Sequence, residues 1–206
     1  MPFVLELVDL TQLPAPGEIL THREQAFYQT LKLPKRKSEW LGGRLALKRL
    51  LAAHTGRALT DFTVLVSGGV GKPTVFCEGE EITVPFSLTH SNGYALAAIA
   101  PQHRHIGIDL EKVTPRINAW KTDFFHPSEL TDNTDEFLTT LWTQKEAVVK
   151  LLGSGLTVNS FDVRVVDCKP QFFGRASEMY RRLGCPPIRL TTRPLLSGFV
   201  FSVALA

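Results

Sequence analysis

The 206-residue sequence predicts an α+β fold in two similar halves, 1–103 and 104–206, each richer in helix at first and in strands afterwards. Two features of the chain lead to this class. Each half closes on a very apolar strand, at 94–100 and at 199–205, and a polar connection at 101–105 lies between the halves. An apolar content of 44% is typical of a globular protein that can bury a substantial core.

The first half is expected to contain two helices followed by strands. Residues 18–32 form the first helix and residues 35–54 a longer one with an apolar stripe. Gly42 and Gly43 inside the longer helix cost stability, so either another group approaches closely there or the helix packs tightly. Strands are expected at 62–67, 74–77, 82–88 and 94–100.

The second half begins with a strand at 106–111 and continues with a helix at 117–125. Asn133, with Glu136 three residues later, is a good N-cap for a helix that runs to residue 152, where a glycine ends it. Further strands are expected at 161–166, 188–192 and 199–205.

Charge, hydropathy and cysteine count exclude several classes of protein. The net charge of +3 does not indicate nucleic acid binding, although it suits an acidic protein partner or a phosphate-rich ligand. No run approaches the roughly 18 apolar residues of a membrane span, and the first ten residues do not resemble a signal peptide. Three widely spaced cysteines indicate a reducing compartment, so we expect a cytoplasmic protein without a disulfide framework or zinc site.

Carboxylates on the strand at 106–111 are the first candidate site. Side chains alternate along a strand, so Gly107, Asp109 and Glu111 share one face. Two like charges held so close need a cation or a proton to neutralise them. Glu146 and Lys150 lie four residues apart, on one face of a predicted helix. Asp109, Glu111 and Glu146 therefore predict an all-oxygen Mg²⁺ site shared with substrate phosphates, with Lys150 beside the phosphate.

Neither motif is specific by itself. A D-x-E sequence on a strand is often a solvated face, and an E-x-x-x-K pair on a helix is usually a surface ion pair. Lys145 points about 100° away from Glu146 on the helix, and its role is left open.

Residues 67–72 (SGGVGK) are similar in sequence to a phosphate-binding loop, but the residues that follow do not fit one. Such a loop needs Ser or Thr after its lysine to hold Mg²⁺, and a helix whose first N–H groups hold the phosphates. Here Pro73 follows Lys72, and a strand is expected next. Lys72 is therefore either a point charge near a ligand phosphate, with Pro73 stiffening the loop against a flat base, or a solvated lysine.

His90 is the second candidate for binding phosphate. It lies at a strand end beside Ser91, and an Asn-Gly turn comes directly afterwards. The hydroxyls and turn N–H groups allow His90 to hold a phosphate, whereas a histidine at a strand exit is otherwise structural or exposed.

Several segments together resemble a known family. GIDLE at 107–111, FFHPSE at 124–129 and WTQKEAVVKLLG at 142–153 resemble motifs of the 4′-phosphopantetheinyl transferases, specifically the Sfp (surfactin-synthetase-activating) type. Three further strings agree, namely GKP at 71–73, FSLTHS at 86–91 and WLGGR at 40–44. The match runs from about residue 35 to 160, and the last part of the chain carries no motif.

The resemblance implies two α+β halves related by a pseudo-twofold axis, with the active site in the cleft between them. It implies Mg²⁺ at Asp109, Glu111 and Glu146, and a leaving phosphate stabilised by Lys150. It also implies that Glu129 accepts the proton of the attacking hydroxyl, directly or through water. Alternatively, Glu129 is only a first-turn acid favoured by the helix dipole, and His126 is a rival base.

Coenzyme A is the co-substrate that the resemblance implies. Its phosphates are expected at Lys72, His90 and Ser91, and its flat base at Pro73. Arg44 is chosen as the guanidinium that clamps the 3′-phosphate. The basic run at 35–37 could equally be a solvated helix face.

The sequence thus predicts a Mg²⁺-dependent enzyme that moves the 4′-phosphopantetheine arm of coenzyme A onto a serine of an apo acyl or peptidyl carrier protein. We expect it to act as a monomer, without nucleic acid or membrane partners. Two alternatives remain, a Mg²⁺-dependent hydrolase of coenzyme A and a non-catalytic module that binds coenzyme A or a carrier protein.

Overall fold

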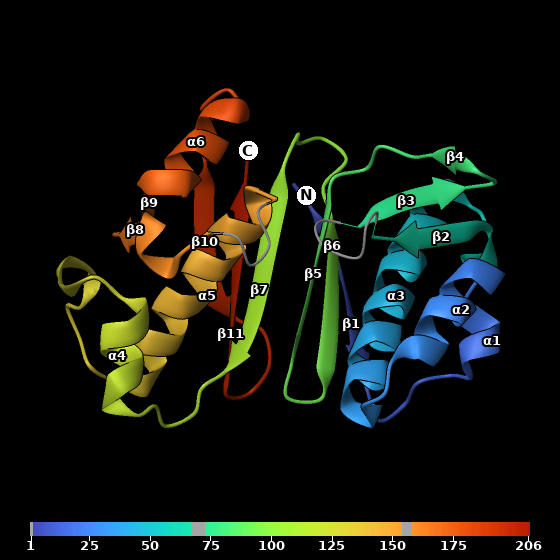
Figure 1. Ribbon diagram of the computed structural model, residues 1–206, viewed down its shortest axis with the longest axis horizontal. Helices are drawn as coiled ribbons and strands as arrows, with labels where there is room; N and C mark the ends of the chain where they lie inside the picture. Colours follow the sequence, from blue (N-terminus) through green and yellow to red (C-terminus); the bar gives the residue numbers. More distant parts are fainter. Residues whose placement is uncertain (1, 67–72, 154–157) are drawn as a thin grey trace. The chain divides into compact units, whose positions relative to one another are not determined.

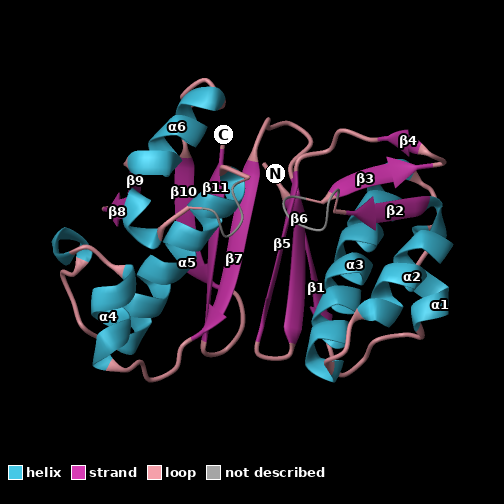
Figure 2. Ribbon diagram, in the orientation of Figure 1, coloured by secondary structure: helices cyan, strands magenta, loops and turns pink. Residues whose placement is uncertain are grey.

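The computed structural model describes residues 2–66, 73–153 and 158–206. The chain divides into two compact units, Met1–Gln102 and His103–Ala206. Each unit combines helices with antiparallel strands (Figures 1 and 2), which confirms the mixed α and β class expected from the sequence.

A three-stranded antiparallel sheet forms the centre of the first unit. Its central strand is β6 (Tyr94–Ile99), which pairs with β1 (Val4–Asp9) on one side and with β5 (Phe86–Ser91) on the other. The long helix α3 (Pro34–Thr55) packs on this sheet. The remaining elements are α1 (Pro16–Ile19), α2 (His22–Thr30), and a second sheet of β2 (Phe62–Leu65), β3 (Thr74–Cys77) and β4 (Glu80–Glu81).

Helix α3 has clear sequence signals at both ends. Pro34 occupies its first turn, and Gly56 ends it in the left-handed conformation with φ of 77°. A Cβ at Gly42 would overlap the side chain of Leu10, whereas nothing lies within 4 Å of a Cβ at Gly43. Gly42 therefore serves tight packing of the helix.

The second unit also centres on a three-stranded antiparallel sheet. Its central strand is β11 (Phe199–Leu205), between β7 (Ile106–Lys112) and β10 (Arg189–Pro194). The long helix α5 (Asp135–Leu151) packs on β7 and β11. The remaining elements are α4 (Asn118–Phe124), a 3₁₀ turn η3 (Pro127–Glu129), β8 (Val163–Val166), β9 (Lys169–Phe172) and α6 (Gly174–Arg182).

Packing of α5 on β7 depends on one glycine. A Cβ at Gly107 would overlap the carbonyl oxygen of Ala147 and the backbone nitrogen of Leu151. The helix backbone therefore lies directly against the strand at this point, on the face that Gly107 shares with Asp109.

The two units have the same order of strands. In each, the first strand is an edge, the last strand is central, and the penultimate strand is the other edge. Each unit also inserts its long helix between its first strand and a small accessory sheet. This shared topology agrees with the expectation of two similar halves.

Several sequence expectations need correction. The helix expected at 18–32 is two helices, α1 and α2, separated at Leu20, which is extended with ψ of 134°. The strand expected at 82–88 is wrong, because residues 82–85 are irregular and the strand begins at Phe86, after a proline that cannot donate to a ladder. Thr134, and not Asn133, caps α5. Strands β1 and β9 and helix α6 were not expected. Among the described helices, none is long and apolar enough to cross a bilayer.

Candidate functional site

An ion pair between α5 and β7 is the centre of the candidate site. Lys150 Nζ lies 2.7 Å from Asp109 Oδ1, and the side chain of Asp109 is only 5% exposed. The close approach at Gly107 brings the helix within reach of the strand. The pairing therefore joins helix to strand, whereas the sequence placed Lys150 beside Glu146 on the helix surface.

Glu146 belongs to the same charged cluster. Burial raises the pKa of Glu146, Lys150 opposes that shift, and the charges of Asp109 and Glu111 add to it. The three carboxylates are thus close enough to influence one another's ionisation. A cation at this place would relieve their mutual repulsion.

The chemistry of these donors fits Mg²⁺, which prefers carboxylate oxygen. As the side chains stand, however, no group of three or more His, Cys, Asp or Glu residues is arranged as a metal site in the part of the chain that the structure describes. Asp109 is paired with Lys150 instead. Asp109, Glu111 and Glu146 as metal ligands therefore stay a prediction.

A largely apolar pocket of about 460 Å³ opens beside this cluster. Glu146 and Lys150 contribute its charged side, and Phe124, Trp142 and Val149 contribute apolar surface. Trp142 is fixed by aromatic neighbours, including Phe124 at 5.0 Å and Trp120 at 5.6 Å between ring centroids. The pocket offers apolar surface beside the ammonium group of Lys150, and Asp123 adds a further carboxylate to its lining. Sequence reasoning did not identify this aromatic wall.

Glu129, the predicted base, lies beneath α5 and is 3% exposed. Its two oxygens accept hydrogen bonds from Lys145 Nζ at 3.1 and 2.8 Å. His126, the rival base, is half-buried, and its Nδ1 lies 2.7 Å from Ser128 Oγ.

His90 lies at the end of β5 in the first unit, next to the beginning of α3. Its Nε2 is 3.3 Å from a guanidinium nitrogen of Arg36, and its Nδ1 is 3.6 Å from Glu39. Lys35 lies 3.9 Å from the same carboxylate. Arg36 also lies 4.0 Å from Glu39, so Arg36 and His90 form an exposed pair around one carboxylate, which an anion bound there would have to replace. The sequence placed Arg36 within a basic run but did not pair it with His90.

Arg44, the residue chosen for the 3′-phosphate, is buried. Its Nε donates to the carbonyl of Val64 at 3.2 Å, and its guanidinium stacks 4.3 Å from the ring centre of Trp40. Burial lowers the pKa of Arg44 to about 10, Glu24 opposes this shift and Arg36 adds to it. These contacts fix Arg44 within the helix packing, and a phosphate role for it stays a prediction.

The other predicted coenzyme A residues are only partly described. Lys72 lies outside the described residues. Pro73 is half-buried just before β3. Ser91 is buried at the end of β5, and its Oγ accepts a hydrogen bond from Asn92 at 3.2 Å.

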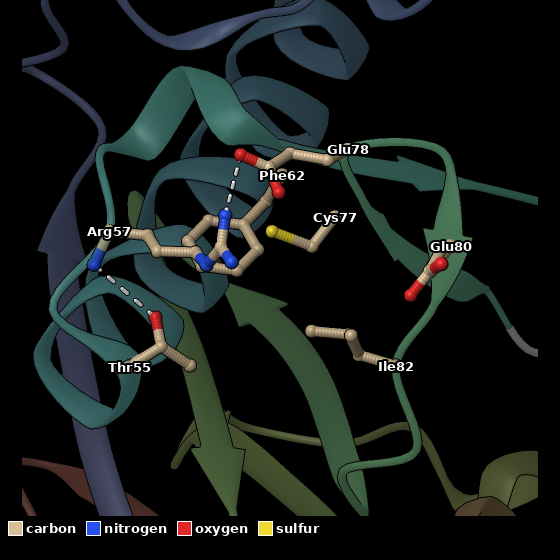
Figure 3. A pocket seen from close by; sticks show the side chains of 7 residues that line it. All are labelled: Thr55, Arg57, Phe62, Cys77, Glu78, Glu80 and Ile82. Carbon is tan, nitrogen blue, oxygen red and sulfur yellow. Dashed lines mark hydrogen bonds and ion pairs between the residues drawn. The ribbon is translucent and has the colours of Figure 1, made fainter.

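A second pocket, of about 280 Å³, lies in the first unit between the end of α3 and β3 (Figure 3). Arg57 and Glu78 pair across it at 2.7 Å, and Cys77 is buried in its wall. None of the predicted site residues in the described ranges lines it. Its cation, Arg57, is already paired with Glu78, and Glu80 adds a further carboxylate, so we place the candidate site at the first pocket.

Comparisons with known proteins agree on one family. A sequence model described as the 4′-phosphopantetheinyl transferase superfamily matches residues 105–187. A holo-[acyl-carrier-protein] synthase of Geobacillus kaustophilus is 37% identical over 89 residues, which are 41% of this chain and 68% of that protein. The 4′-phosphopantetheinyl transferase AcpT of Escherichia coli is 30% identical over 132 residues, 57% of this chain and 59% of that protein.

The matches cover these relatives only in part. The chain spans 59% of the Escherichia coli protein and 63% of a Synechocystis relative. Among solved structures, the holo-[acyl-carrier-protein] synthase of Thermotoga maritima matches with a TM-score of 0.39 and 22% identity, over 61% of this chain and 74% of that one.

Proposed function

Because the chain belongs to the 4′-phosphopantetheinyl transferase superfamily, we propose that it transfers the 4′-phosphopantetheine moiety of coenzyme A to a serine of an apo carrier protein. The serine oxygen forms a bond to the β-phosphorus, the bond from that phosphorus to the ADP oxygen breaks, and 3′,5′-ADP leaves. The carrier is an acyl or peptidyl carrier protein, of which the relatives' names mention the acyl carrier protein.

The observation that carries this proposal is the Asp109–Lys150 pair next to Glu146, at the edge of an apolar pocket. The pocket takes the pantetheine arm, whose chain is mostly uncharged. Lys150 meets the phosphate that the arm carries and stabilises the leaving oxygen. Phosphoryl transfer needs mainly such positioning and charge neutralisation.

Mg²⁺ held by Asp109, Glu111 and Glu146 would neutralise the pyrophosphate when bound. Lys150 would then exchange Asp109 for a phosphate oxygen as its partner. Arg36 and His90, with Lys72, Ser91 and Arg44 as the sequence predicts, would bind the phosphates of coenzyme A. Pro73 would stiffen its loop against the base. The Sfp subclass, the pseudo-twofold relation with a cleft site, the monomeric state and the cytoplasmic location stay predictions, as does Glu129 as the base.

Mass spectrometry of a panel of apo carrier proteins tests the proposal. Incubation with coenzyme A and Mg²⁺ should add one phosphopantetheine mass to at least one carrier and release 3′,5′-ADP. Cleavage of coenzyme A without any carrier would indicate the hydrolase instead. No product with any carrier and no cleavage would contradict both enzymatic functions.

A further inference from the structure

Lys145 is almost completely buried, at 1% exposure, although it precedes a candidate metal ligand on α5. Its ammonium group donates to both oxygens of Glu129 and to the carbonyl of Phe124 at 3.0 Å. Glu129 also accepts from the backbone N–H groups of His126 at 2.8 Å and Val165 at 2.9 Å. With two bonds on each oxygen, the four lone-pair sites of the carboxylate are all occupied.

The first unit contains the same arrangement. Lys48 on α3 is fully buried and donates to Glu24 Oε2 and to the carbonyl of Ile19 at 2.7 Å. Glu24 also accepts from the backbone N–H groups of Thr21 at 2.9 Å and Val64 at 3.0 Å. A second buried lysine–glutamate pair thus anchors the other long helix.

The correspondence extends to sequence offsets. In each unit the lysine bonds the carbonyl five residues before the glutamate, at Ile19 and at Phe124. The glutamate accepts a hydrogen bond from the backbone N–H of the residue three positions before it, Thr21 or His126. It also accepts one from the third residue of the strand that follows the long helix, Val64 or Val165. Four matching contacts show that the pair is one structural device present twice.

The two copies differ in the residue that comes directly after the lysine. After Lys48 comes Arg49, which makes an exposed ion pair with Glu6 at 3.0 Å. After Lys145 comes Glu146, at the candidate site. The first copy therefore fixes a helix without a candidate metal ligand, whereas the second fixes the helix that carries Glu146 and Lys150.

We propose that Lys145 is a positioning residue for the transfer reaction: with Glu129 it sets the rotation and depth of α5, and so the place of Glu146. Glu129 is the partner of Lys145, its oxygens already accept from four donors, and it does not take the serine proton, which passes to solvent water. The catalytic part of this assignment rests on the proposed transfer function. The anchoring part does not.

Two matched double-mutant cycles test the proposal. The second unit receives E129Q, K145M and E129Q/K145M, and the first unit receives E24Q, K48M and E24Q/K48M as controls. A single substitution leaves one buried partner unpaired, whereas the double substitution leaves neither charge. In both units, the urea midpoint of the double variant should lie above that of the less stable single variant. If the shift in urea midpoint of each double variant equalled the sum of the shifts of its two single variants, the anchoring role would be contradicted.

Transfer rates separate the two units. We expect E129Q and K145M to slow single-turnover transfer by about 10–100-fold, as for residues that orient a ligand from behind. E129Q/K145M should be faster than E129Q, and the first-unit variants should keep the wild-type rate at saturating coenzyme A. If Glu129 is the base, the double variant stays as slow as E129Q, with a loss of roughly 10²–10⁴-fold, and the proposal is overturned.

Mg²⁺ titration calorimetry without substrate provides a readout that does not depend on transfer. K145M should bind Mg²⁺ about 10–100-fold more weakly than the wild type, and K48M should bind it equally well. Equal affinities for wild type and K145M would overturn the positioning role even if no carrier were modified. If a single variant fails to fold, the transfer rate of E129Q/K145M still distinguishes the two roles of Glu129, because this double variant lacks the carboxylate that a base mechanism needs.

Discussion

The two units share a scaffold and differ in the chemistry placed on it. Each pairs a carboxylate of its first strand with a cation of its long helix, Glu6 with Arg49 and Asp109 with Lys150. In the first unit the two side chains are 30% and 48% exposed, and in the second they are 5% and 27% exposed. Solvent screens the first pair, which therefore contributes little to stability. The second pair lies in a less polar site, where the interaction between charges is stronger.

This difference indicates what makes a catalytic surface on a repeated scaffold. Both long helices are anchored by a buried lysine–glutamate pair, so anchoring alone does not make a site. The second unit adds carboxylates at Asp109, Glu111 and Glu146 and places an apolar pocket beside them. Substitutions at equivalent places in the two units should therefore have very different effects.

The largest difference is expected for the strand carboxylates. Asp109→Asn should abolish transfer while the protein stays folded, because it removes a predicted Mg²⁺ ligand and leaves the pyrophosphate charge uncompensated. Glu6→Gln should leave transfer unchanged. Steady-state transfer assays and circular dichroism check both variants. Activity in EDTA equal to that in Mg²⁺ would refute the metal requirement itself.

The helix cations should show the next largest difference. Lys150→Met should lower kcat by about 10²-fold, because it removes a group that stabilises charge on the leaving oxygen. Its effect on the KM for coenzyme A should be smaller. Arg49→Met, at the exposed pair, should change neither parameter. Equal losses in the two variants would remove Lys150 from the chemical step.

The sequence was sufficient for elements with a strong apolar pattern. The helix expected at 35–54 is α3, and the strands expected at 106–111 and 199–205 are β7 and β11. Helix α6 was missed although Ala176, Met179 and Tyr180 follow helical spacing and pack on the core of the second unit, because the helix is only nine residues long and its other residues are glycine or polar. Strand β1 was missed because its residues are mostly half-exposed at a sheet edge.

The candidate site was predictable residue by residue but not in its contacts. The motifs at 107–111 and 142–153 identified Asp109, Glu146 and Lys150 as candidates. Helical spacing, however, predicts only that Lys150 lies near Glu146. Its actual partner, Asp109, is 41 residues away in sequence. Likewise, nothing in sequence predicts a fully buried lysine, because lysine is almost never buried unless it is paired. Such partners come from tertiary packing, which one sequence does not reveal.

Alanine substitutions at two glycines test how tightly each long helix packs on its sheet. Gly107→Ala should destabilise the protein by about 1–3 kcal/mol or more, because the new Cβ overlaps backbone atoms of α5 that cannot move separately. Gly42→Ala should cost less than Gly107→Ala, since its new Cβ meets mainly the flexible end of Leu10, with Ala95 Cβ at 3.1 Å, and the change gains helix propensity. Urea denaturation measures both. A greater loss for Gly42→Ala would reverse this comparison of the two helix contacts.

The smallest effect is expected where the first unit is proposed to hold coenzyme A. Arg36→Gln should raise the KM for coenzyme A about tenfold, which corresponds to ~1.4 kcal/mol for one charge-assisted hydrogen bond. The KM for 3′-dephospho-coenzyme A should change much less, because that substrate lacks the phosphate being bound.

Arg44→Gln is the matched comparison. If Arg44 clamps the 3′-phosphate, it will discriminate between the two substrates in the same way. If Arg44 serves packing against Trp40, the variant will instead lower the urea midpoint and affect both substrates equally. Equal effects of Arg36→Gln on the two substrates would show that the pair of Arg36 and His90 does not bind the 3′-phosphate.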